Sequence, residues 1–267
     1  TATLLDGRIA IITSFEYDGS YGQENTMIQI DSDTYLLAYK AYGGYLKTFT
    51  IPADGSTVTQ VAGLGYSSTT SYMYQNDLLQ IDADTYILAY SGHDATTSYG
   101  QHIKTFKVKP DGSSIVQIGH LEHDTNYGST DYSDLVRVDH DTYALAYYGY
   151  DGGGDNVNGG WIKTFTVNGG SITQVAKLRH YTSSSSHFSF IKVDADTYAL
   201  AFTDGANDGN ISTFTIPADG SSITQAGTLE HDTDMGRYNS FVQVDDDTYA
   251  LSYQGTGTDG FIKTFTI

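Results

Sequence analysis

Short stretches with apolar residues at every second position recur along the whole chain and predict β-strands, because successive strand side chains point to opposite faces. The last repeat predicts strands over 240–244, 248–253 and 261–267, separated by an Asp-rich turn and a Gly-rich loop. The preceding repeat adds a fourth strand over 223–230, after a Pro-Ala-Asp-Gly turn. In that turn Pro presets φ and Gly accepts a positive φ. No stretch has helical spacing.

The second strand of each repeat belongs to a phrase that occurs five times. Asp-Thr-Tyr, followed by an apolar run that ends in an aromatic residue, begins at Asp33, Asp84, Asp141, Asp196 and Asp247. The intervals are 51 to 57 residues, a period that is typical of repeat architectures. Four antiparallel strands repeated five times predict an all-β fold, a five-bladed β-propeller that forms a single domain over 1–267.

The same phrase predicts how the blades pack and how the ring closes. Leu37 and Tyr39 lie on one face of their strand and the small Ala38 on the other, so a bulky face can bury the small face of the next blade. The run 8–18 matches a fourth strand and 261–267 a third strand. We therefore expect these two terminal strands to pair, which would complete one blade and remove a free sheet edge.

Composition narrows the class of partner. The chain has 32 acidic and 13 basic residues, a formal charge of −19, and no cysteine. Disulfides and thiolate metal sites are therefore excluded. Nucleic acid and anionic membranes are poor partners, because no basic cluster is left for phosphate groups. No apolar run is long enough to span a bilayer. We expect no membrane insertion, an extracellular or cell-surface location, and a monomeric isolated domain.

The two rims of the predicted propeller differ in sequence. One rim repeats Asp-x-Asp-Thr and Pro-Asp-Gly-like turns, whereas the loops on the other rim vary in length and content. Binding residues tend to lie on variable loops carried by a rigid scaffold. The tyrosines outside the second strands fall in segments that lead to this variable rim. Such an aromatic rim either shields strand ends or recognises sugar rings and polar partner surfaces.

One position on the variable rim carries a different side chain in every repeat. It lies at the start of the third strand, as expected either of five non-identical ligand pockets or of drift at a half-exposed site. Trp161, the only tryptophan, follows two glycines and is the best stacking candidate, and Tyr150 lies in the preceding loop. The residues at this position are Tyr45, His102, Trp161, Asn210 and Phe261.

Glu-His-Asp occurs twice, around His123 and His231, where the fourth strand ends. Neighbouring strand residues point to opposite faces, so an adjacent His and Asp do not form the geometry of a catalytic triad. Tyr17 and Tyr66 replace the histidine in other repeats. The sequence therefore predicts rim residues that contact a ligand rather than a catalytic base.

A glycine-rich loop carries oxygen ligands at Asp151, Asp155 and Asn158. Oxygen atoms spaced through glycines can surround Ca²⁺, but their order does not match an EF-hand. The loop is either a flexible polar segment or a weak calcium site. Asp-x-Asp-Thr turns can also hold cations, although Asp side chains commonly cap their own backbone in turns. We expect no cofactor to be required.

Two carboxylates favour an enzymatic alternative. Asp77 and Asp134 open the innermost strands of neighbouring blades, where other repeats have Thr or Ser. A pair of acids at the mouth of a channel suits glycoside hydrolysis. Against this hypothesis, near-identical repeats give little sign of a single specialised site.

The phrases Asp-Thr-Tyr-Ala-Leu-Ala-Tyr, Ile-Lys-Thr-Phe-Thr-Ile and Asp-Gly-Ser-Ser-Ile-Thr-Gln resemble repeats of uncharacterised microbial surface and secreted proteins. In organisation the chain is similar to tachylectin-type lectins, a resemblance that implies a five-bladed propeller with one sugar site per repeat. The tachylectin binding motif is absent, so no site residue carries over. We expect a non-enzymatic, multivalent recognition domain for glycans. The alternatives are a protein-interaction or structural module that binds a surface protein, and a glycoside hydrolase.

Overall fold

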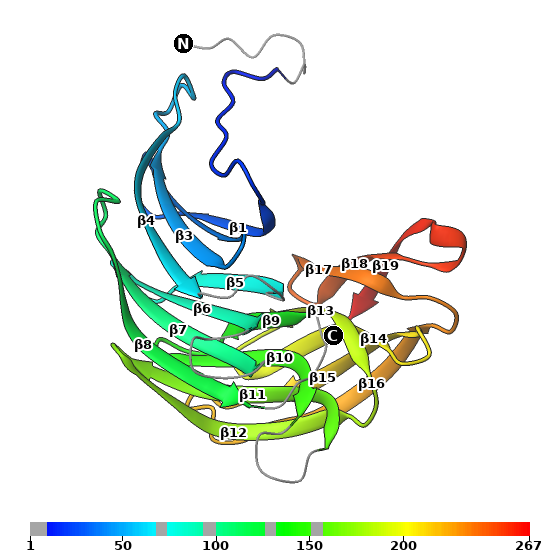
Figure 1. The fold of residues 1–267 in the computed structure, drawn as a ribbon. Coiled ribbons are helices and arrows are strands. Elements are labelled where there is room, and N and C mark those ends of the chain that lie inside the picture. The colour runs from blue at the N-terminus through cyan, green and yellow to red at the C-terminus, as the bar shows by residue number, and fades with distance from the viewer. Residues whose placement is uncertain (1–9, 68–73, 93–99, 126–131, 151–156) are drawn as a thin grey trace.

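The computed structural model describes residues 10–67, 74–92, 100–125, 132–150 and 157–267. It consists of β-strands and one short 3₁₀ turn, η1 (Thr256–Thr258). The strands form five antiparallel sheets, each built from consecutive strands (Figure 1). The repeat predicted this order of sheets, and the all-β fold with five antiparallel sheets is confirmed, although the fifth sheet has three strands.

The first sheet contains β1 (Gln23–Gln29), β2 (Thr34–Lys40), β3 (Gly44–Thr50) and β4 (Thr59–Ser67). The second contains β5 (Tyr74–Gln80), β6 (Thr85–Gly92), β7 (Gly100–Val108) and β8 (Ile115–Asp124). The third contains β9 (Ser133–Arg137), β10 (Thr142–Tyr150), β11 (Asn158–Asn168) and β12 (Ser171–Tyr181). The fourth contains β13 (Ser185–Lys192), β14 (Thr197–Asp204), β15 (Gly209–Thr215) and β16 (Thr224–Asp232). The fifth contains β17 (Arg237–Asp245), β18 (Thr248–Gln254) and β19 (Gly260–Thr266).

The core lies between neighbouring sheets. Tyr86 and Leu88 of β6 pack against Leu36 and Ala38 of β2, and the equivalent contacts recur at the next three junctions. A bulky face thus meets a small face, as the alternation in the Asp-Thr-Tyr phrase predicts. The innermost strands also contact one another from sheet to sheet, so they surround the axis of the arrangement.

Hydrogen bonds on the regular rim join each of the first three blades to the blade that follows it. The Thr164 hydroxyl of β11 donates to the carbonyl of Gly220 in the next blade, at 2.7 Å. Thr48 and Gly112 make the same contact between the first two blades. Gly220 has a φ of +65°, which explains why the turn ends in glycine. The Asp82 carboxylate accepts the backbone N–H groups of its own turn, as expected of a structural cap.

The expected pairing of residues 8–18 with 261–267 is not present. The described part of the N-terminal segment, 10–18, forms no strand, and the fifth sheet ends at β19. Instead the segment packs on the first sheet: the rings of Phe15 and Phe49 lie 6.0 Å apart, and those of Tyr17 and Tyr39 lie 5.0 Å apart. The first and fifth sheets stand at the two ends of an open arc (Figure 1).

Candidate functional site

The residues at the start of the third strands are cross-strand partners of the aromatic residue that ends each second strand. Trp161 pairs with Tyr147, and its indole N–H donates to the carbonyl of Gly149 at 3.2 Å. Trp161 is only 6% exposed, and His102 and Asn210 are also buried. Tyr45 is half-buried and Phe261 is 40% exposed. In this set, therefore, a ligand has access only to Tyr45 and Phe261.

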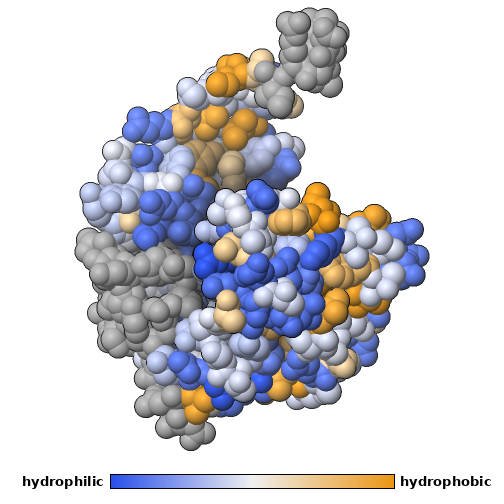
Figure 2. Space-filling view, turned by 90° about the vertical axis from the view of Figure 1, so that its right-hand side faces the viewer, coloured by the Kyte–Doolittle hydropathy of each residue, from blue (hydrophilic) through white to orange (hydrophobic). Residues whose placement is uncertain are grey.

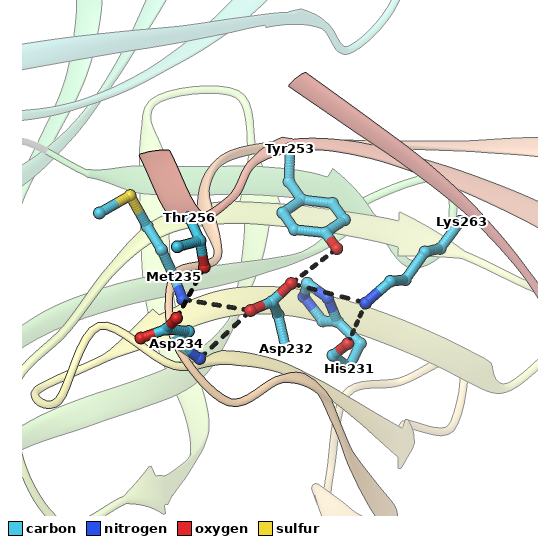
Figure 3. Close-up of polar contacts among 7 residues, drawn as sticks. All are labelled: His231, Asp232, Asp234, Met235, Tyr253, Thr256 and Lys263. Atoms are coloured by element: carbon cyan, nitrogen blue, oxygen red, sulfur yellow. Dashed lines mark hydrogen bonds and ion pairs between the residues drawn. The ribbon is translucent and has the colours of Figure 1, made fainter. Parts of the chain in front are cut away.

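The histidines near the ends of the fourth strands lie beneath the following blade. Figure 3 shows His231, whose backbone carbonyl accepts a hydrogen bond from Lys263 of the next blade. The neighbouring Asp232 accepts a hydrogen bond from the Tyr253 hydroxyl at 2.8 Å and forms an ion pair with Lys263 at 3.5 Å. The second carboxylate oxygen of Asp232 accepts the N–H of Met235 and so holds the turn that follows. This group of contacts locks one blade to the next.

The histidine rings belong to the same packing. The ring of His231 meets Tyr253 edge-on at 4.7 Å, and that of His123 meets Tyr147 at 5.0 Å. Burial lowers the pKa of His231 to about 4 and the pKa of His123 well below its usual value. Both rings are therefore neutral at pH 7. They are buried packing residues, and their contact with a ligand stays a prediction.

Asp77 and Asp134 are brought together at the inner strands, at a position that joins neighbouring blades. The Ser133 hydroxyl donates to Asp77 at 3.1 Å, and the Phe190 N–H donates to Asp134 at 2.7 Å. Ser189 holds the equivalent place in the fourth sheet and accepts the N–H of Phe241. Part of the role of both carboxylates is therefore structural.

The electrostatics of this acid pair are unusual for a structural contact. Desolvation, followed by repulsion from Asp134, raises the pKa of Asp77 well above its ordinary range. Desolvation also raises the pKa of Asp134 to about 7, although the hydrogen bond from the Phe190 N–H lowers it in part. Pairs of carboxyl groups with raised pKa values are frequent in active sites. The arrangement can hold a proton near neutral pH.

The structure reveals a set of strained residues that sequence reasoning missed. Glu24, Gln75, His187 and Tyr238 have φ values between +46° and +54°, a conformation that is uncommon outside glycine. Each lies two residues before the inner-strand position just described, at an irregularity in the strand pairing. Tyr132 stands at the equivalent place in the third sheet. No sequence signal marks these positions, because none of them is Gly or Asn.

The aromatic rings at three of these five positions contact one another and form what we call the mouth cluster: Tyr132, His187 and Tyr238. The ring of His187 lies 4.1 Å from that of Tyr132 and 4.5 Å from that of Tyr238. Burial, followed by the charge of Arg237, lowers the pKa of His187 to about 4, so this imidazole ring is neutral at pH 7. Tyr238 is 62% exposed and presents the open end of the cluster.

A polar hollow of about 310 Å³ adjoins the mouth cluster, and we call it the mouth cavity. Tyr132 belongs to both, while exposed Glu24 and Asn25 stand at its border. Oxygen and amide groups beside an aromatic surface are the usual elements of a small polar-ligand site. The lining residues are Glu24, Asn25, Thr26, Gln75, Asn76, Asp77 and Tyr132.

Two of the three predicted calcium ligands, Asp151 and Asp155, lie outside the described residues. Asn158 is exposed and its amide donates to the Tyr148 hydroxyl at 3.2 Å. Tyr150 is half-buried, and its carbonyl lies 3.5 Å from the Tyr147 hydroxyl. Within the described ranges, no group of three acidic or histidine side chains is arranged to hold a metal ion. In the same part of the chain, no helix has the length and apolar character to cross a membrane.

Comparison with known proteins supports the architecture. No family model matches the chain, and no curated protein matches it in sequence. A solved protein of Lactobacillus plantarum is similar in structure, with a TM-score of 0.60 at 15% identity over 88% of this chain and 67% of its own. Sqt1 of Saccharomyces cerevisiae is similar with a TM-score of 0.53 at 10% identity, over 93% of this chain and 66% of its own. The NanB sialidase of Streptococcus pneumoniae is similar with a TM-score of 0.53 at 12% identity, over 79% of this chain and 32% of its own.

The chain thus spans about two thirds of the first two of these proteins and about a third of the sialidase. At such low identity a likeness extends to the fold and not to the activity. Together with the five consecutive antiparallel sheets, these matches place the chain among proteins of β-propeller architecture.

Proposed function

We propose that the protein is a non-enzymatic carbohydrate-recognition domain whose principal site is the mouth of the inner strands on the variable rim. The single observation that carries this proposal is the aromatic mouth cluster beside the polar mouth cavity. Sugar rings have apolar C–H faces that stack on aromatic rings and hydroxyl groups that require hydrogen-bond partners. The exposed face of Tyr238 offers an aromatic ring for stacking. Glu24 and Asn25 offer partners for the sugar hydroxyl groups.

Charge and strain support the same choice of ligand. With a formal charge of −19, the protein repels anionic glycans, so we propose neutral sugars as the ligand class. Left-handed non-glycine residues at four equivalent positions store strain, and such strain concentrates at functional sites. A glycan-binding role agrees with the proposed extracellular or cell-surface location, where a surface protein is the alternative partner.

The Tyr238→Ala variant tests this proposal. We expect it to bind immobilised neutral glycans about fivefold more weakly, since loss of a stacking contact costs about 1 kcal/mol. Tyr42→Ala is the matched control: Tyr42 is similarly exposed on the same rim but packs on Tyr21, away from the mouth cluster. A glycan array at high protein density, with and without Ca²⁺, provides the measurement. No binding in either condition would contradict the proposal, and equal losses in both variants would contradict the placement of the site at the mouth cluster.

The acid pair favours a second candidate, a glycoside hydrolase. A carboxyl group that holds its proton near pH 7 can donate it to a leaving sugar, while a second carboxylate acts as nucleophile or base. If this candidate is correct, Asp77→Asn and Asp134→Asn each reduce hydrolysis of a chromogenic glycoside by at least a hundredfold. Ser189→Ala, at the equivalent inner-strand position, serves as the control. Hydrolysis that persists in both Asn variants would exclude this pair.

A further inference from the structure

Two histidines meet on the outer two strands of the second sheet, and we call them the histidine pair. His102 lies on β7 and His120 lies on β8. The Nδ1 atom of His102 and the Nε2 atom of His120 are 3.2 Å apart, and the two ring centroids are 5.3 Å apart. His102 is buried, whereas His120 is exposed. The pair can therefore be reached from solvent on the side of His120.

The surroundings of His102 determine where the lone pair of its ring points. The Nε2 atom lies 3.1 Å from the carbonyl oxygen of Gly92. Because a carbonyl only accepts hydrogen bonds, Nε2 donates its N–H, and in the neutral ring Nδ1 carries the lone pair that faces His120. The ring also stacks on Tyr90, with centroids 5.0 Å apart, which restricts its rotation. Metal-ligating histidines are commonly oriented by such a hydrogen bond from the second ring nitrogen to a backbone carbonyl.

We propose that the histidine pair binds a divalent transition-metal ion of the class that prefers imidazole nitrogen, for which Zn²⁺ is the probe. In a tetrahedral zinc site with Zn–N bonds of about 2.0–2.1 Å, two nitrogen ligands lie about 3.3 Å apart. The observed separation of 3.2 Å suits one ion between the two rings. His120 then coordinates through Nε2 and carries its proton on Nδ1. Water completes the coordination, because within the described ranges no third acidic or histidine side chain is arranged to join the pair.

The pair is particular to the second blade. The strand register puts the same two positions diagonally opposite each other in every four-stranded sheet, and in the third sheet their side chains also meet, with an ammonium group 5.9 Å from an indole ring centre. Only the second blade has an imidazole at both positions. The residues at these positions in the other sheets are Tyr45 with Gly63 in the first, Trp161 with Lys177 in the third, and Asn210 with Thr228 in the fourth.

The charge of the molecule favours a cation at the pair. The formal charge is −19, and the face in Figure 2 is mostly hydrophilic outside a few apolar patches. Glu122, the cross-strand partner of His102, adds an acidic side chain on the same strand as His120. The opposing charge is that of Lys104, whose ammonium group donates to the carbonyl of Tyr66 in the first blade at 2.6 Å. Acidic surroundings raise the local concentration of cations.

Calorimetric titration of the metal-free chain, without a histidine tag, with Zn²⁺ at pH 7.5 tests the proposal. We expect one ion per chain with a Kd in the micromolar range. His120→Thr, which introduces the residue that the fourth blade has at this position, should weaken binding at least tenfold. His140→Thr is the matched control, since His140 is an exposed histidine in the turn between β9 and β10, and it should leave binding unchanged. Equal affinity in the natural chain and the His120→Thr variant would overturn the proposal.

Two further measurements separate the histidine pair from general attraction of cations to an acidic protein. Ca²⁺ prefers oxygen ligands, so an equal concentration of Ca²⁺ should not displace Zn²⁺, and displacement would contradict the proposal. Imidazole must be neutral to coordinate, so binding should be lost as the pH falls below about 6. Zn²⁺ should also raise the urea midpoint of unfolding of the natural chain and not that of His120→Thr or His102→Asn. A similar rise in His120→Thr, whose altered side chain is exposed, would place the ion elsewhere and refute the site.

Discussion

At pH 8 the Asp134→Asn variant is expected to unfold at a higher urea concentration than the natural chain, and the difference should disappear near pH 4. Desolvation raises the pKa of Asp134 to about 7 in the folded state, whereas an unfolded Asp titrates near 4. Below pH 4 both states are protonated. Between pH 4 and 7 the unfolded state releases its proton first, so stability falls as the pH rises.

The expected gain for Asp134→Asn at pH 8 is about 2–4 kcal/mol, since each pKa unit corresponds to about 1.4 kcal/mol. The asparagine oxygen can still accept the N–H of Phe190. Asp194→Asn is the control: its carboxylate accepts two backbone N–H groups, which lower its pKa, so this variant should gain no stability at pH 8. If Asp134→Asn is the less stable protein at pH 8, the ionised carboxylate stabilises the blade junction and the argument from desolvation is wrong.

The Lys163→Ala variant is expected to lose about 3–5 kcal/mol of its free energy of unfolding. Lys163 is fully buried, its ammonium group donates to the carbonyl of His123 at 2.7 Å, and it lies 5.4 Å from the ring centre of Tyr147. Its removal leaves a cavity and an unpaired carbonyl at the junction of the second and third blades. Urea unfolding followed by circular dichroism provides the measurement.

Ser212 is the matched control for Lys163, because it occupies the equivalent position on β15. Its hydroxyl forms a hydrogen bond with Thr228 at 3.1 Å. Ser212→Ala should therefore cost only about 1 kcal/mol. Equal losses of unfolding free energy in the two variants would show that the buried lysine at the blade junction contributes nothing beyond ordinary packing.

The strands and the packing of the blades could be predicted from the sequence, because both follow from local rules. The alternation of Tyr, Leu and Ala in the second strands determines which side chains face the neighbouring blade, and Pro-Ala-Asp-Gly determines the turn. The fourth strand of the fifth blade did not follow in the same way. Residues 10–18 match that strand in sequence but contact the first sheet, and a repeat period alone does not decide which of two neighbours holds a shared segment.

The candidate site was less predictable. Trp161 stands among glycines on a variable rim, yet the register of β10 and β11 places it against Tyr147 in the interior. The approach of Asp77 to Asp134 could be expected, because both lie at equivalent positions of the inner strands of adjacent blades. The mouth cluster could not be predicted, because the residue types of His187 and Tyr238 do not indicate their left-handed backbone conformation. In addition, the contact between these two residues joins the fourth blade to the fifth, so it does not follow from the local sequence.

At the left-handed residues of the mouth, the backbone conformation is constant while the identity of the side chain varies. The backbone follows the same path at Glu24, Gln75, His187 and Tyr238, while an acid, an amide, an imidazole and a phenol project from it. Exchange among side chains that are not branched at Cβ keeps the conformational cost, about 1–3 kcal/mol per residue, similar, whereas a β-branched side chain raises it. At the proposed glycan site, we therefore expect that ligand selectivity can be altered one blade at a time without redesign of a loop. For the proposed glycan site, we expect a small library of side-chain combinations at these four positions to change the specificity.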